Sequence, residues 1–205
     1  MRDNDTYTTI EKPAEAVILK EKNSRFIGYA FPVNDRSEIN KCLETVKKQH
    51  SSARHWCYAW QLGTNDSTES RTNDDGEPRN SAGAPIYGQI QSAKLTNILI
   101  VVVRYFGGVK LGVGGLIKAY RTSAKYAVEA SVPIKKYVET SIQITFKYPN
   151  LSAVMRLIKE NNVKIVSQNM KEKCYMELRI RNHQLKQVIG QLESIYGVMI
   201  VKKQI

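Results

Sequence analysis

The chain has 205 residues, of which 31 are Lys or Arg and 19 are Asp or Glu, so its formal net charge is +12. The length suits one large domain or two small ones, and 42% hydrophobic with 24% charged residues is the composition of a globular protein, which excludes disorder for most of the chain. The longest apolar run, residues 98–103, is far shorter than the roughly 20 residues that span a bilayer. The polar N-terminus has no apolar signal core, so we expect a cytoplasmic protein with no membrane association.

Periodicity of apolar residues predicts five elements in the first part of the chain. They are strands over residues 25–33, 55–62 and 97–104, and helices over residues 38–50, capped by Ser37, and 114–131. The strand at 97–104 is a continuous apolar run, which is typical of a strand buried on both faces. Residues 63–83 are rich in Asn, Asp, Ser, Thr and Gly and show little periodicity, so we expect a long loop there.

Six short elements follow residue 136, in the order strand, helix, strand, strand, helix, strand. They are predicted over residues 138–147, 151–161, 163–168, 174–181, 184–195 and 198–204. This βαββαβ order is the signature of a ferredoxin-like domain. The sequence therefore predicts an α+β protein with two domains, residues 1–136 and 137–205.

The positive charge is concentrated in one segment. Residues 78–136 hold nine bases and a single acid, Glu129, which gives a net charge of +8, whereas residues 66–77 hold five acids and one base. The three cysteines are widely spaced, so we expect reduced thiols rather than a disulfide framework or a metal pair. A basic segment of this kind indicates a polyanionic partner. An ordinary solvated surface can carry the same excess of basic residues.

Residues 106–115, which we call the glycine segment, carry five of the twelve glycines and lie between the buried strand and the helix. Glycines at such a turn let the backbone approach a ligand, and the amides of a helix N-terminus favour an anion such as a phosphate. Lys118, Arg121 and Lys125 recur at helical spacing on the following helix and form a basic stripe. The predicted phosphate or nucleic-acid site comprises Arg104, Gly107, Gly108, Lys110, Gly112, Gly114, Gly115, Lys118, Arg121 and Lys125.

The glycine segment also has a purely structural interpretation, as a tight turn from strand to helix. Its spacing matches neither the dinucleotide-binding fingerprint nor the P-loop, whose Lys and Ser or Thr positions are missing. Glycine at this turn can serve packing alone.

Several motifs resemble the bacterial YigZ branch of the IMPACT family. They are VRYFGGVKLGVGGLIKAY at residues 103–120, DDGEP at 74–78, AG at 82–83, ARHWCYAW at 53–60 and SRFI at 24–27. The resemblance implies an N-terminal domain like the second domain of a small-subunit ribosomal protein, with a left-handed βαβ crossover, followed by a ferredoxin-like domain. It also implies translational control through a protein partner, as in the eukaryotic branch, or nucleic-acid binding, as proposed for the bacterial branch.

The acidic loop at residues 74–78 leaves two interpretations open. Asp74, Asp75 and Glu77 offer carboxylate oxygens that suit Mg²⁺, and His55 could support such a site as a general base. Alternatively, the Asp-Gly pair forms a turn in which the aspartates cap backbone amides and Gly76 takes a positive φ. His55 and Cys57 alone are too few to define a zinc site, so no metal and no cofactor are predicted.

The aromatic residues Trp56, Tyr58 and Trp60 alternate along one strand and fall on one face, where they either stack on bases or fill the core. Our leading hypothesis is a protein that binds RNA or the ribosome and modulates translation, with phosphates held by the glycine segment and the basic stripe. The alternatives are a metal-dependent enzyme acting on a phosphate or nucleotide through the acidic loop, and a regulator that acts through a protein partner.

Overall fold

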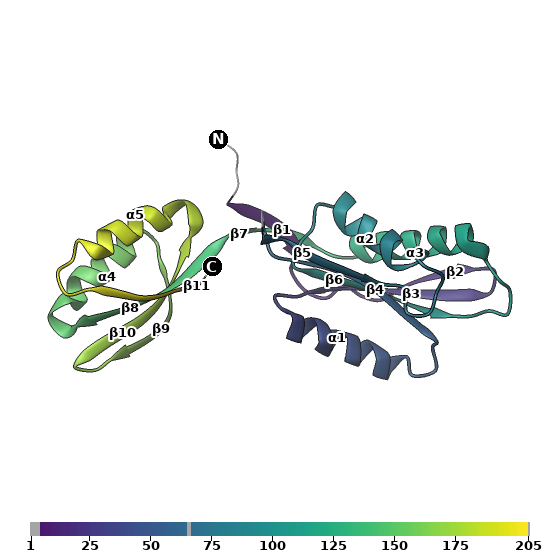
Figure 1. Ribbon diagram of the computed structural model, residues 1–205, viewed down its shortest axis with the longest axis horizontal. Coiled ribbons are helices and arrows are strands. Elements are labelled where there is room, and N and C mark those ends of the chain that lie inside the picture. Colours follow the sequence, from purple (N-terminus) through teal and green to yellow (C-terminus); the bar gives the residue numbers. More distant parts are fainter. Residues whose placement is uncertain (1–4, 65–66, 205) are drawn as a thin grey trace. The chain divides into compact units, whose positions relative to one another are not determined.

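The computed structural model describes residues 5–64 and 67–204 and divides into two compact units (Figure 1). One unit is Tyr7–Lys136, and the other combines Tyr137–Ile205 with the N-terminal residues up to Thr6. Asp5 explains this assignment, because its carbonyl accepts a hydrogen bond from Val138 N and its carboxylate accepts one from His183 N. Both units mix helices with antiparallel sheet, which confirms the predicted α+β class.

The N-terminal unit is built on a five-stranded antiparallel sheet with the order β2-β3-β6-β4-β5. Its strands are β2 (Val17–Glu21), β3 (Ser24–Pro32), β4 (His55–Leu62), β5 (Glu69–Asn73) and β6 (Ile98–Tyr105). A separate two-stranded sheet joins β1 (Thr6–Ile10) to β7 (Pro133–Tyr137). The apolar run of β6 therefore lies at the centre of the larger sheet.

Helices cover both faces of this sheet. Helix α1 (Arg36–Gln49) lies on one face, and α2 (Gly83–Ser92) and α3 (Gly112–Glu129) lie on the other (Figure 1). Alternate residues of β6 enter two separate hydrophobic cores, one with α2 and α3 and one with α1. All residues from Ile98 to Arg104 are consequently buried, as expected for a strand covered on both sides.

The structure corrects two predictions in this unit. The cap of α1 is Asp35, whose carboxylate accepts a hydrogen bond from Glu38 N at 2.8 Å, and not Ser37. The predicted loop at 63–83 contains β5, whose side chains are largely exposed and therefore give no apolar alternation. Its backbone pairs with β4, an interaction that depends on a partner distant in sequence.

His50 ends α1 and joins it to the sheet. Its Nε2 lies 2.5 Å from the Tyr29 hydroxyl and its Nδ1 lies 2.9 Å from the Tyr105 hydroxyl. Burial lowers the pKa of His50 below its usual 6.5, because the charged imidazolium is poorly solvated there.

This lowered pKa predicts a loss of stability in mild acid. The unfolded chain binds a proton near pH 6.5, while folded His50 resists it until the pH is lower, so stability present above pH 6.5 falls as the pH drops through this range. The melting temperature of the wild type should decrease more between about pH 7.5 and pH 5.5 than that of a His50→Gln variant. Equal decreases in the two proteins would show that His50 does not cause the loss.

The C-terminal unit has a four-stranded antiparallel sheet with the order β11-β8-β10-β9, the ferredoxin-like arrangement. Its elements are β8 (Glu139–Lys147), the 3-10 turn η2 (Tyr148–Asn150), α4 (Leu151–Glu160), β9 (Lys164–Met170), β10 (Lys173–Arg181), α5 (Asn182–Glu193) and β11 (Met199–Gln204). Both helices cover one face of the sheet, where their apolar side chains form a single core with β8 and β10 (Figure 1). All six elements predicted for this part of the chain are present.

Candidate nucleic-acid interface

The acidic loop and the buried strand meet at an ion pair. Glu77 Oε1 lies 2.7 Å from Arg104 Nη1, and the two side chains are only 4% and 7% exposed. The Tyr120 hydroxyl donates a second hydrogen bond to the same carboxylate oxygen at 2.8 Å. Glu77 therefore neutralises Arg104, which contributes N–H donors to the site rather than net charge.

Cys57 and Tyr120 lie beside this pair and remain protonated at neutral pH. Burial raises the pKa of the Cys57 thiol, and the carboxylates of the acidic loop raise it further. The pKa of Tyr120 is also raised, first by burial and then by Cys57 and Glu77. The thiol lies 2.9 Å from the Asp74 carbonyl and 3.3 Å from the Tyr120 hydroxyl oxygen, so its proton serves one acceptor at a time. A thiol held in this form does not act as a nucleophile.

Each aspartate of the acidic loop is bonded to backbone amides. The Asp74 carboxylate accepts hydrogen bonds from the amides of Asn80, Ala82 and Gly83 at 2.8–3.0 Å, which places it at the N-terminus of α2. The Asp75 carboxylate accepts a hydrogen bond from Trp56 N at 2.7 Å. These bonds use both carboxylate oxygens of Asp74 and Oδ2 of Asp75.

The remaining features of this loop are those of the Asp-Gly turn. Gly76 has a φ of +84° and Asp75 a φ of +42°, and Glu77 N donates to the Asp74 carbonyl at 2.9 Å. His55 Nδ1 donates to the Asp75 carbonyl at 2.8 Å. Within residues 5–64 and 67–204, no three His, Cys, Asp or Glu side chains are grouped as metal ligands. The metal-dependent interpretation of the acidic loop therefore has no donor set to support it.

The glycine segment opens a cavity of about 390 Å³ between the end of β6 and the start of α3. Its lining residues are Glu77, Pro78, Arg104, Phe106, Lys110, Leu111, Gly112, Val113 and Leu116. The structure thus brings Arg104, Lys110 and part of the glycine segment together. Of the predicted residues, the basic stripe lies further along α3 and does not line this cavity.

Helix α3 begins at this cavity without a cap. Leu111 occupies the N-cap position and gives no side-chain hydrogen bond, and the first turn contains no acid. The first amides of an α-helix have no partner within the helix, and its dipole places partial positive charge there. An uncapped N-terminus of an 18-residue helix is therefore suited to an anion.

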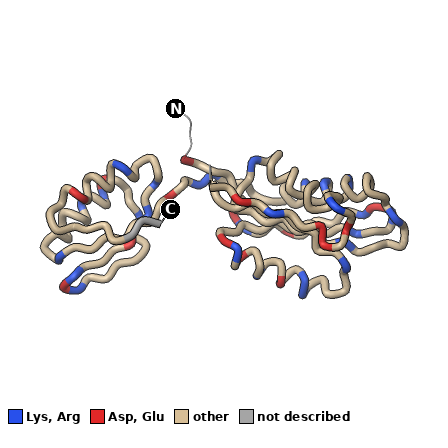
Figure 2. Tube along the Cα trace, viewed as in Figure 1, with Lys and Arg blue, Asp and Glu red and all other residues tan. Residues whose placement is uncertain are grey.

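The basic stripe is exposed along α3, and Figure 2 shows basic positions recurring along this helix. Lys125 Nζ lies 3.5 Å from Glu129 Oε1, a surface pair one turn apart. Lys118 and Arg121 have no carboxylate within 4 Å among the residues that the structure describes. Two cations further along α3 are therefore available to an external anion.

The comparisons with known proteins agree with one another. A model of the Impact N-terminal domain matches residues 22–128. An IMPACT family member of Haemophilus influenzae is 31% identical over 194 residues, which cover 93% of this chain and 94% of that protein. The chain belongs to the IMPACT family. The IMPACT family member YigZ of Escherichia coli is 33% identical over 171 residues, covering 82% of this chain and 83% of that protein.

A solved structure shares the fold of nearly the whole chain. A crystal structure described as that of a hypothetical protein superimposes with a TM-score of 0.75 and 26% identity, and covers 96% of this chain and 97% of that one. The Impact N-terminal match includes the acidic loop, the glycine segment and the basic stripe, so the whole candidate interface lies inside the family domain. Among the described residues, no helix has the length and apolar character to span a membrane.

Glycines of this IMPACT interface have different physical roles. A Cβ at Gly107 would lie 2.0 Å from the carbonyl carbon of Asn23, so only glycine fits against the turn between β2 and β3. Gly108 and Gly112 have φ values of +85° and +71°, which glycine adopts without strain. A Cβ at Gly114 would meet no atom within 4 Å. Gly107 therefore serves packing, whereas no neighbouring atom requires glycine at position 114.

This difference predicts a large loss of stability for one alanine substitution and a small change for another. Gly107→Ala should lower the free energy of unfolding by about 3 kcal/mol, because backbone must move to admit the methyl group. Gly114→Ala should change it by less than about 1 kcal/mol, because its Cβ enters open space. Urea unfolding followed by tryptophan fluorescence measures both, and a stable Gly107→Ala protein would contradict the packing role.

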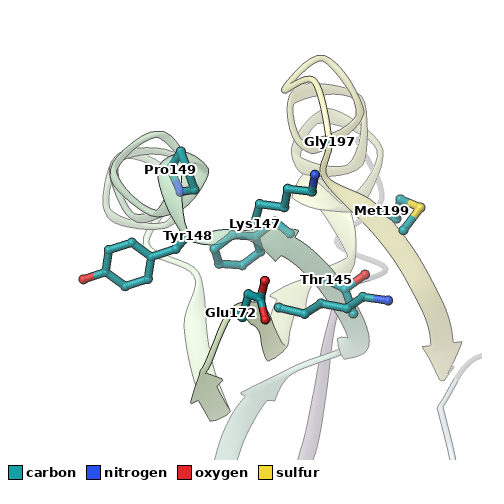
Figure 3. A pocket seen from close by; sticks show the side chains of 9 residues that line it. Thr145, Lys147, Tyr148, Pro149, Glu172, Gly197 and Met199 are labelled. Carbon is teal, nitrogen blue, oxygen red and sulfur yellow. The ribbon is translucent and has the colours of Figure 1, made fainter.

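A larger cavity, of about 680 Å³, lies in the C-terminal unit (Figure 3). Phe146, Tyr148, Pro149 and Met199 give it mainly apolar walls, and the exposed side chains of Lys147, Glu172 and Lys173 are also among its lining residues. It lacks the buried charged pair and the open helix N-terminus of the glycine-segment cavity. No sequence pattern indicates this cavity, because its walls come from strand ends and turns far apart in the chain.

The aromatic ladder of β4 faces the core beside α1. Trp60 is 4% exposed, and Trp56 and Tyr58 pack against the same core. We expected these side chains either to stack on bases or to fill the core. Core packing accounts for their positions.

Proposed function

We propose that this IMPACT family protein binds RNA or the ribosome in the cytoplasm and regulates translation. The observation that carries the proposal is the uncapped N-terminus of α3, which opens on a cavity lined by Arg104 and Lys110. Further along the helix lie Lys118 and Arg121, which have no carboxylate partner among the described residues. Phosphates are the anions that such an arrangement suits best. The family resemblance supports the link to translation, since its eukaryotic branch is associated with translational control.

An electrostatic contact of this kind has a characteristic salt dependence. Binding that neutralises phosphates releases counterions, so affinity falls steeply as salt increases and depends little on sequence. Purified protein should co-sediment with ribosomes and bind RNA at about 50 mM salt, and should lose at least about tenfold in affinity by about 200 mM. Absence of binding to both at low salt would overturn the proposal.

Crosslinking in cells locates the contact and tests the protein-partner alternative. Ultraviolet light should join RNA to peptides within residues 104–125, where the glycine segment and the basic stripe lie. A protein partner that stays bound after nuclease treatment, together with an absence of RNA crosslinks, would favour a regulator acting through protein contacts instead.

A further inference from the structure

We propose that the glycine-segment cavity receives one unstacked nucleotide of a single-stranded RNA, with its base against Phe106 and its phosphate at the start of α3. The inference rests on the proposed RNA binding and adds to it the form of RNA that this site selects. It differs from binding by the basic stripe alone, which would accept single strands and duplexes alike.

The walls of the cavity are too apolar for a phosphate alone. Five of its lining side chains are apolar, namely Pro78, Phe106, Leu111, Val113 and Leu116. Phe106 is 50% exposed and Val113 is 52% exposed, so water contacts apolar surface at this site. A ligand that joins an apolar planar group to an anion would cover these walls and use the helix N-terminus together. The volume of about 390 Å³ lies in the range of small-ligand sites.

Arg104 supplies an independent sign that the cavity takes a polar group. The residue is 5% exposed and lines the cavity, and its Nε–H has no hydrogen-bond partner among the described residues. A buried donor without a partner is costly, and because the Nε atom itself is covered, a ligand acceptor would satisfy it after a small shift of the guanidinium. Because Glu77 already balances the charge of Arg104, this donor suits a neutral acceptor such as a base oxygen or nitrogen.

Phe106 is placed to stack on a base. The Arg104 guanidinium carbon lies 5.4 Å from the centroid of the Phe106 ring, a contact that holds the ring while half of the residue stays exposed. Base stacking on aromatic side chains is a common mode of single-strand binding. Lys110 is exposed and lines the same cavity, where its ammonium can reach a phosphate.

A duplex cannot use this cavity. Bases in A-form RNA are stacked and paired, and the helix presents its phosphates and ribose hydroxyls instead. The aromatic residues of β4 do not offer another platform, because they pack in the core beside α1. Preference for a single strand would therefore depend on Phe106.

The test compares a labelled single-stranded RNA of about 12 nucleotides with the duplex of the same sequence at low salt. The wild type should bind the single strand at least about tenfold more tightly than the duplex. Phe106→Leu keeps apolar area but removes the aromatic face, so it should lose this preference, while Phe106→Trp should keep it. Tyr196→Ala removes an aromatic that is 97% exposed and does not line the cavity, and should leave the preference unchanged.

The possible results are distinct. Equal binding of single strand and duplex, unchanged in Phe106→Leu, would overturn this inference and leave the proposed function in place. Absence of RNA binding would overturn this inference, and absence of ribosome binding as well would overturn the proposed function. Competition by phosphotyrosine but not by adenosine monophosphate would also overturn it, in favour of a peptide ligand.

Discussion

A Glu77→Ala variant should lose about 3–5 kcal/mol of unfolding free energy, the usual effect of leaving one member of a buried ion pair without its partner. The Arg104 side chain is only 7% exposed, so water solvates its charge poorly when the carboxylate is removed. The Tyr120 hydroxyl would lose its acceptor in the same step. Urea unfolding measures this effect through tryptophan fluorescence, because Trp56 and Trp60 both lie in the N-terminal unit.

The chain offers a matched control for this prediction. Glu129→Ala removes the carboxylate of an exposed pair with Lys125, whose side chains are 60% and 55% exposed. That change should alter the free energy of unfolding by less than about 0.5 kcal/mol, since surface pairs contribute little. Replacing both partners, as Glu77→Leu with Arg104→Met, should recover most of the stability lost in Glu77→Ala. A loss below about 1 kcal/mol in Glu77→Ala would mean that the guanidinium finds another partner or reaches water.

Periodicity located the elements whose side chains are sorted by burial. The continuous run of β6 and the alternation of β4 carry the central sheet, and both were predicted to within a residue or so. The C-terminal helices α4 and α5 were found for the same reason, because each buries one apolar face. Local pattern was sufficient wherever an element packs one face against a core.

Elements held by distant backbone contacts were missed. Strand β5 reads Glu-Ser-Arg-Thr-Asn and is fixed by pairing with β4. Helix α2 begins at Gly83 and contains Pro85 and Gly88, and its first amides are bonded by Asp74, nine residues earlier. Contacts of this kind produce no periodic pattern of apolar residues in the sequence.

The candidate interface shows the same division. The glycine segment and the basic stripe were evident from spacing, and the cavity forms where the turn was expected. The pairing of Arg104 with Glu77 spans 27 positions in the chain and converts a predicted cation into a neutral pair. The Phe106 ring likewise contacts that buried guanidinium. The sequence therefore predicts where the basic residues lie along the chain. Only the folded structure shows which of them are neutralised by a carboxylate.

Reversing the charge of Lys118 and Arg121 should have the largest effect on RNA binding. A Lys118→Glu, Arg121→Glu variant should bind RNA on the order of 100-fold more weakly at low salt, because two attractive contacts become repulsive. Filter binding across a salt series measures the affinity, and the slope of log affinity against log salt should become shallower by about 1.4 for single strands. Both residues are exposed, so the melting temperature should stay close to that of the wild type.

A control with the same change in charge separates a local contact from general attraction. Lys41 and Lys48 lie exposed on α1, which covers the opposite face of the sheet from α3. Lys41→Glu with Lys48→Glu lowers the net charge by the same amount, so a long-range effect of net charge would weaken binding equally in both variants. Weak binding in the α3 variant alone would assign the contact to the stripe. Equal losses would instead mean that RNA responds to the overall charge of +12, and the α3 face would then have no special role.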